Sequence, residues 1–221
     1  MNVESIPQNF FENLPIESHG FKLEILNSES EKRFNLFRYS LNHREALGFF
    51  NEETKEFNLQ LSIDLLDFCD IRFIAGDIDR FAQNLKNFLP NELKRLGSSD
   101  VENLSELVRE KKITEWNFDL PTRIENFSLE IEPQNLFEIP NGSYLIIDYC
   151  DFESESSFSI IYNLFRDEFF CEERIHRNPD INYEFESTTL EELQSKLAEH
   201  LIESITAMRQ KISMMEVDLQ L

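Results

Sequence analysis

A short stretch of this sequence occurs twice, and the repetition constrains the fold more than any other feature. Residues 14–25 match residues 120–131 without a gap, and six of the twelve positions are identical. A second ungapped match aligns residues 46–90 with residues 158–202, at an offset of 112 instead of 106. A repeat of this length is a whole domain rather than a solenoid unit, so we predict a tandem duplication of one fold.

Apolar residues at every second position indicate several short strands in each copy. In the first copy they are Phe21, Leu23 and Ile25, then Phe34 and Leu36, then Phe57, Leu59, Leu61 and Ile63. A polar run at 51–56 predicts a β-hairpin over 46–63, and a further short strand is predicted at 71–74. The second copy repeats the pattern at 116–120, 127–131, 145–149, 158–164, 169–175 and 183–185. Each copy is therefore expected to form a mainly antiparallel sheet of about five strands.

A helix is expected to follow the strands in each copy. Asp77 suits an N-cap, and the apolar residues after it recur at helical spacing until Pro90, where we predict that the helix ends. In the second copy Thr188 and Glu191 have the spacing of a capping box, opening a helix to about Met215. Strands followed by one helix predict an α+β fold in which each helix packs on one face of its sheet. The expected boundaries are 1–98 for the first unit, 99–112 for a helical connector and 113–221 for the second unit.

Charge restricts the partners. The chain has 43 Asp and Glu against 21 Lys and Arg, a formal net charge of −22. Nucleic acid and anionic membrane would repel it, whereas a basic protein would be attracted. No apolar stretch has the roughly 20 residues of a membrane span. Three cysteines, Cys69, Cys150 and Cys171, lack disulfide or CxxC spacing. Together with the absence of a signal-like start, these features predict a cytoplasmic protein with free thiols.

The sequence has none of the motifs that carry common enzyme chemistry. Five scattered glycines form no phosphate-binding loop, and the four histidines have no metal-ligand spacing. Asp64, Asp67 and Asp70 are spaced like cation ligands, but the glycine of a tight cation loop is missing. We therefore expect no cofactor, no metal and no catalytic site.

The candidate partner-contacting residues are acidic side chains of the second copy. They are Asp148, Asp151, Glu153, Glu155, Glu172, Glu173, Glu184 and Glu186. Strand alternation places Glu184 and Glu186 on the face opposite Tyr183 and Phe185, which predicts an outward acidic face. The small, acidic, motif-free α+β chain is similar in general character to toxin-immunity proteins of bacteria. The leading hypothesis is thus a non-enzymatic inhibitor or immunity-type partner of a basic protein.

Two other classes of function remain open from the sequence. One is a hydrolase or small-ligand protein with its site between the two copies, since duplicated domains often bind ligands where they meet. The other is an assembly module in which the helix from Leu190 to Met215 mediates contact between chains, because its apolar stripe is near coiled-coil spacing. The oligomeric state is not predicted.

Overall fold

The computed structural model describes residues 6–30, 32–98, 104–140 and 142–218. The chain divides into two compact units, Met1–Ser98 and Ser99–Leu221. Both are built from antiparallel sheets and helices, which confirms the predicted α+β class.

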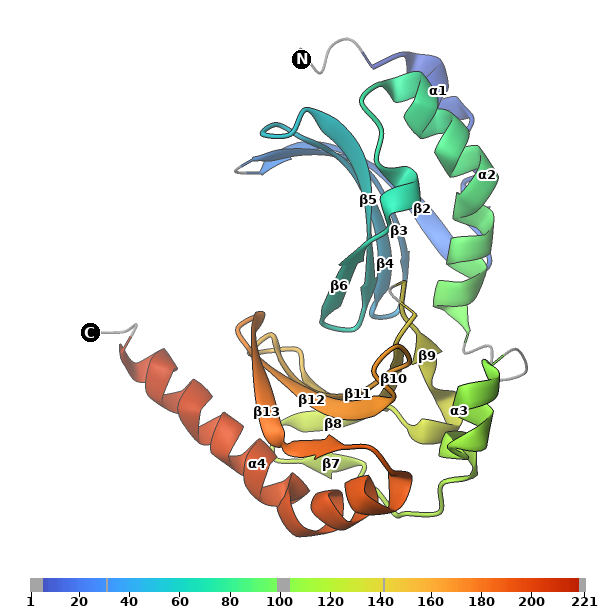
Figure 1. Cartoon of the computed structure of the whole chain (residues 1–221). Coiled ribbons are helices and arrows are strands. Elements are labelled where there is room, and N and C mark those ends of the chain that lie inside the picture. Colours follow the sequence, from blue (N-terminus) through green and yellow to red (C-terminus); the bar gives the residue numbers. More distant parts are fainter. Residues whose placement is uncertain (1–5, 31, 99–103, 141, 219–221) are drawn as a thin grey trace. The chain divides into compact units, whose positions relative to one another are not determined.

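Unit 1 holds a six-stranded antiparallel sheet whose strands follow one another in chain order (Figure 1). Its elements are α1 (Gln8–Glu12), β1 (Glu17–Ser18), β2 (Phe21–Ser30), β3 (Arg33–Leu41), β4 (Arg44–Asn51), β5 (Glu56–Ile63), β6 (Leu66–Cys69), the 3-10 helix η2 (Ile71–Phe73) and α2 (Ile78–Gly97). The hairpin predicted over 46–63 is confirmed by the pairing of β4 with β5.

Unit 2 holds a seven-stranded antiparallel sheet in the order β13-β12-β11-β10-β8-β7, with β9 also paired to β10. Its elements are α3 (Glu106–Glu110), η4 (Ile113–Glu115), β7 (Arg123–Ile124), β8 (Phe127–Ile131), η5 (Pro133–Asn135), β9 (Phe137–Glu138), β10 (Tyr144–Asp151), β11 (Ser156–Asn163), β12 (Glu168–Ile175), β13 (Asn178–Ser187) and α4 (Leu190–Asp218). Each sheet thus has more strands than the five expected, because two-residue strands such as β1 and β7 have no alternation to detect.

Strand pairing follows the same register in the two units. Asn51 lies opposite Glu56 at the end of β4 and β5, and Asn163 lies opposite Glu168 at the end of β11 and β12. In both turns the asparagine side chain accepts hydrogen bonds from two following backbone amides. The numbers in each turn differ by the offset of 112 that the sequence match shows.

The repeated Leu-Pro pair has a structural role in both units. The hydroxyl of Tyr39 donates to the carbonyl of Pro15 at 2.7 Å, and the hydroxyl of Tyr149 donates to the carbonyl of Pro121 at 2.7 Å. Both tyrosines are fully buried, and their hydroxyls need a partner because an unpaired buried donor costs free energy. These hydrogen bonds tie the segment before the first strand of each unit to the centre of its sheet.

We expect Tyr149→Phe to lower the free energy of unfolding by about 1 kcal/mol, because the carbonyl of Pro121 loses its donor while the ring stays packed. Tyr39→Phe should have an effect of similar size in unit 1. Tyr183→Phe is the matched control, since the Tyr183 side chain is exposed. Urea unfolding followed by circular dichroism measures all three, and equal stabilities for Tyr149→Phe and Tyr183→Phe would contradict the assigned role.

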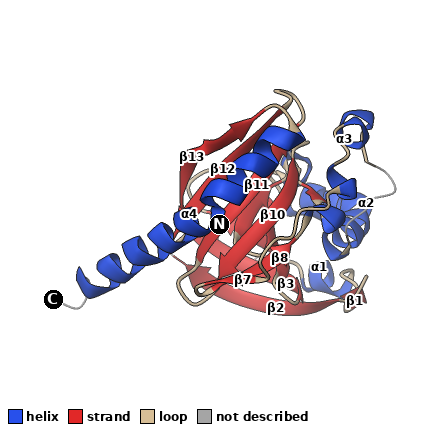
Figure 2. Ribbon diagram, turned by 90° about the horizontal axis from the view of Figure 1, so that it is seen from below, coloured by secondary structure: helices blue, strands red, loops and turns tan. Residues whose placement is uncertain are grey.

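Aromatic and aliphatic side chains join each helix to its sheet. In unit 1 the Phe81 ring of α2 stacks on the ring of Phe57 from β5, with centroids 5.5 Å apart. In unit 2 α4 contacts β13, β12 and β7 (Figure 2). The buried residues of α4 are Leu193, Leu197, Leu201, Ile205, Met208 and Ile212. Their spacing of three or four residues forms one apolar stripe along the helix.

Two predicted helix boundaries are wrong. The α2 helix continues through Pro90 to Gly97, because Leu93 and Leu96 extend the buried stripe and outweigh the one helical hydrogen bond that proline cannot donate. The α4 helix is capped by Thr189 rather than Thr188, since the Thr189 hydroxyl accepts from the amide of Glu192 at 3.3 Å. The Asp77 cap is confirmed by its hydrogen bond from the amide of Arg80 at 2.8 Å.

Two predicted strands are also wrong. Residues 71–73 form the 3-10 helix η2, which the side chain of Asp70 caps through the amide of Arg72. Residues 116–120 lie in no strand; Trp116 is part of the core of unit 2, and Phe118 packs against that core. Part of the predicted connector, 99–103, lies outside the described residues, whereas Leu104 and Val108 are buried in the same core.

Candidate protein-binding surface

Exposed acidic side chains gather where β13 meets one flank of α4. Glu184 and Glu186 are exposed on β13. Two contacts show which flank of α4 is adjacent: His200 Nε2 lies 3.3 Å from a Glu184 oxygen, and Lys196 Nζ donates to the carbonyl of Glu186 at 2.6 Å. Residues three or four apart share a helix flank, so the exposed Glu192, Glu199 and Glu203 belong to this side. We call these five glutamates, with Tyr183, the β13–α4 surface.

Three of the eight acidic residues singled out in the sequence are enclosed. Asp148 is 0% exposed and accepts from the hydroxyl of Ser159 at 2.7 Å. Asp151 is buried and accepts from the hydroxyl of Ser154 at 2.8 Å, and the buried Glu173 accepts from Asn182 at 2.6 Å. These three candidates are therefore not part of an outward acidic face, which alternation predicted for Glu184 and Glu186 only. Their short hydrogen bonds to neighbouring polar groups offset the cost of burial.

Of the other five acidic residues, two accept hydrogen bonds from arginine side chains. Glu172 accepts from Arg174 at 2.7 Å, and Glu155 accepts from Arg177 at 2.8 Å. Glu153 is exposed, as are Glu184 and Glu186. Glu184 and Glu186 are thus the two of the eight that join the β13–α4 surface.

The sequence analysis did not predict Tyr183, or the three glutamates of α4, as part of this surface. Alternation placed Tyr183 inside with Phe185, but Tyr183 is 73% exposed whereas Phe185 is 0% exposed. The cause is a register shift: Cys171 pairs with Asn182, but the next pair is Phe169 with Ser187. More residues on β13 than on β12 lie between these pairs, so strict alternation fails there. An exposed tyrosine among acids is a typical anchor of a protein interface.

At one position of this surface, that of Glu184, unit 1 has a residue of the opposite charge, Arg72. Asp70 and Asn182, at the offset of 112, both accept from a backbone amide two residues on, that of Arg72 and that of Glu184. In unit 1 the Arg72 guanidinium forms ion pairs with Asp70 and Glu92. In unit 2 the same backbone position presents Glu184 to solvent. The fold therefore holds this position in place, while the side chain determines whether it closes an ion network or adds to an acidic surface.

Two cysteines and three tyrosines have pKa values shifted away from reactivity. Burial raises the pKa of the Cys171 thiol well above its usual value, and burial also raises the pKa of Cys69. Burial likewise raises the pKa of Tyr39, Tyr149 and Tyr162. A thiol or phenol that stays protonated is a poor nucleophile, whereas catalytic nucleophiles usually have lowered pKa values. The three cysteines, all within the described part of the chain, are thiols and not disulfides.

Comparison of the chain with protein-family models, with curated proteins and with solved structures found no match. Among the described residues, no three or more His, Cys, Asp and Glu side chains are grouped to hold a metal ion, and Asp64, Asp67 and Asp70 are no exception. None of the described helices is both long and apolar enough to cross a membrane.

Proposed function

We propose that this protein is a non-enzymatic binding module that captures a basic protein, in the manner of an intracellular bacterial inhibitor or immunity protein. The observation that carries the proposal is the β13–α4 surface, in which five exposed glutamates of β13 and α4 occur together with the exposed Tyr183 of β13. An exposed aromatic side chain on a predominantly acidic surface, where Lys196 pairs with Glu192 and His200 lies beside Glu184, suits a partner of the opposite charge. The net charge of −22 would add long-range attraction and speed encounter.

A non-enzymatic role is supported by the chemistry of the reactive side chains. The pKa values of two cysteines and three tyrosines are raised by burial, which keeps these groups protonated. The short hydrogen bonds of Asp148, Asp151 and Glu173 serve the sheet of unit 2 rather than a solvent-facing site.

We also propose that the two units arose by duplication of one sheet-and-helix module and then diverged in function. The common strand registers, the paired Tyr–Pro hydrogen bonds and the paired asparagine turns support a common origin. The change from Arg72 to Glu184 supports the divergence. In this proposal unit 2 supplies the partner-binding surface, whereas the same position in unit 1 stabilises the fold.

Affinity capture from the native cell tests the proposal. The wild-type chain is expected to recover one basic protein in stoichiometric amount. The double variant Glu184→Lys, Glu186→Lys should bind that protein at least about tenfold more weakly at low salt, since it turns attraction into repulsion on the contact surface. Raising the salt concentration should narrow the difference, because exposed charges are screened.

The control variant carries the same charge change elsewhere. Glu12→Lys with Glu52→Lys alters two exposed acids of unit 1 and should leave binding within about twofold of wild type, because only long-range attraction changes. Equal loss in both double variants would show that net charge, not the β13–α4 surface, governs binding. Recovery of no stoichiometric protein partner, together with turnover of a small molecule by the purified chain, would refute the proposed function.

A further inference from the structure

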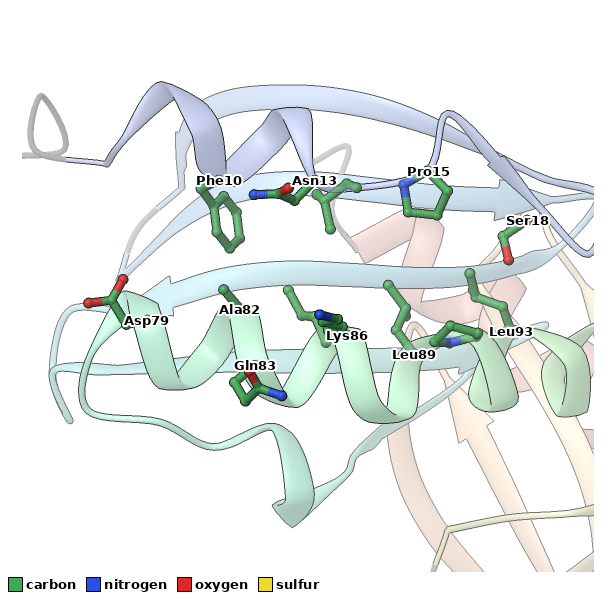
Figure 3. Close-up of a pocket in the computed structure, with 13 residues that line it drawn as sticks. Phe10, Asn13, Pro15, Ser18, Asp79, Ala82, Gln83, Lys86, Leu89 and Leu93 are labelled. Carbon is green, nitrogen blue, oxygen red and sulfur yellow. The ribbon is translucent and has the colours of Figure 1, made fainter.

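Unit 1 contains a groove of about 450 Å³ between the segment that precedes its sheet and α2 (Figure 3). Phe10, Asn13 and Pro15 line one wall, and Ala82 and Leu89 line the other. This volume lies in the range of natural small-molecule sites. All lining residues belong to unit 1, so the groove is complete within a single unit.

The deep part of the groove is apolar. Leu14, Leu85, Leu89 and Leu93 line it and are almost fully buried. Lys86 also lines the groove from α2, and within the described ranges its ammonium has neither a carboxylate nor a hydrogen-bond partner. An apolar cavity with a few convergent polar groups is typical of sites that hold amphipathic small molecules.

The charged side chains of the lining lie at different places along α2. Lys86 lies one turn before Pro90, which also lines the groove. Asp79 lines the groove close to Phe10 in Figure 3. The anionic Asp79 thus lies at one end of the groove, whereas Lys86 lies between Asp79 and Leu93 along α2, next to the buried leucines.

A second groove, of about 550 Å³, lies in the equivalent part of unit 2. Trp116 takes the place of Phe10 at the offset of 106, and Glu191 and Gln194 take the places of Asp79 and Ala82 at the offset of 112. Apart from Trp116, Thr189 and the half-buried Leu190, charged and amide side chains line this second groove, and its described lining contains no fully buried leucine. Its equivalent of Lys86 is Ala198, which does not line it. The fold thus forms a groove here in both units. The groove of unit 1 differs in that four almost fully buried leucines line it, whereas the groove of unit 2 has Lys111, Lys112 and the half-buried Leu190.

We propose that the groove of unit 1 binds a small amphipathic carboxylate, with its apolar body on the buried leucines and its carboxylate at Lys86. The charge of the lining favours an anionic head group, because Lys86 is the one cation among the described residues that line the groove, and its ammonium is available to pair. The volume of the groove limits the apolar part of the ligand, since 450 Å³ accommodates a medium-length alkyl chain but not a folded peptide segment. The inference is independent of the proposed capture of a basic protein, which involves unit 2.

Titration with decanoate, below its micelle-forming concentration, tests the proposal on the full chain. Nuclear magnetic resonance of labelled leucine methyl groups is the readout. We expect saturable shifts at Leu14, Leu85 and Leu89, and weaker binding of decanol and of decyltrimethylammonium, which lack the anionic head. Absence of saturable shifts, or tighter binding of the cationic analogue, would overturn the proposal.

The residues at equivalent positions of unit 2 supply the substitutions for a second test. Ala82→Gln introduces the residue found in the groove of unit 2 and should weaken decanoate and decanol alike, by about tenfold, because it fills the apolar space. Lys86→Ala, again the unit 2 residue, should weaken decanoate by about fivefold and leave decanol unchanged. Lys94→Ala removes an exposed lysine of α2 that does not line the groove, and it is the control. Equal decanoate affinity for Lys86→Ala and Lys94→Ala would refute the role of Lys86.

Discussion

Adding one methyl group at Gly48 is expected to destabilise unit 1 by about 2 kcal/mol, because the space it would occupy is already filled. A Cβ atom built at Gly48 lies 2.3 Å from Cε1 of Phe37, far inside any tolerable contact. Phe37 is the residue directly opposite Gly48 in the pairing of β3 with β4, and it is fully buried. The Phe37 ring packs over Gly48, so that an aromatic side chain fills the space left by the missing side chain of this strand glycine.

Unit 2 fills the equivalent part of its core with different residues. There Ile147 lies opposite Ile160, and Ile160 is equivalent to Gly48 at the offset of 112. One large and one absent side chain in unit 1 thus correspond to two of intermediate size in unit 2. Because total core volume matters more than its distribution, Phe37→Ile combined with Gly48→Ile should recover most of the stability that Gly48→Ile alone removes.

A double-mutant cycle on these two positions measures the coupling. Urea unfolding gives the stabilities, and hydrogen exchange of β3 and β4 peptides assigns the change to unit 1, because the only tryptophan, Trp116, lies in unit 2. We expect a coupling energy of at least about 1 kcal/mol in favour of the double variant. Stability of Gly48→Ala equal to wild type, or additive effects in the cycle, would show that the ring does not require the glycine.

Arg72→Met is expected to destabilise unit 1 by about 3 kcal/mol, since it leaves two buried carboxylates without their shared cation. Asp70 and Glu92 are both buried, and Arg72 contacts both, at 2.6 Å in the case of Glu92. In the variant, Arg95 still pairs with Glu92 at 2.6 Å, and Arg72 is partly exposed in the wild type. The expected loss of stability is therefore at the low end of the losses seen when a buried ion pair is broken. This network attaches η2 to α2.

The cost of Arg72→Met should depend on pH. Burial raises the pKa of Asp70, but the hydrogen bonds and charge of Arg72 lower it by more, so the net pKa lies below the usual aspartate value. A carboxyl with a lowered folded pKa contributes stability above its unfolded pKa of about 3.9, and that contribution is lost as the pH falls through the folded value. The difference between wild type and Arg72→Met should therefore be largest near neutral pH and shrink below about pH 4.

Urea unfolding at several pH values measures this dependence, with Arg80→Met as the control. Arg80 is an exposed arginine of α2 whose side chain has no partner among the described residues, so its loss should cost less than about 0.5 kcal/mol at every pH. A pH-independent cost for Arg72→Met would mean that the aliphatic packing of Arg72 against Phe88, whose ring centre lies 5.5 Å from the guanidinium carbon, contributes more than its charge.

Much of the secondary structure could be predicted because its signals are local. Alternating apolar residues mark β5, the polar run after Asn51 marks the turn between β4 and β5, and Asp77 caps α2 through a neighbouring amide. The candidate surface was harder to predict. Only Glu184 and Glu186 of the eight acids lie on it, because burial depends on which residues pack over a strand and not on the strand's own sequence.

The sequence by itself determined the repeat, the antiparallel α+β class and the excess of negative charge, since each of these depends on residue type and spacing along the chain. Tertiary structure alone decided the continuation of α2 through Pro90, the enclosure of Asp148 and the outward turn of Tyr183. It also decided that a groove forms between α2 and residues far from it in sequence. The physical reason is that burial and register are properties of packed neighbours, and a local pattern records only one side of each contact.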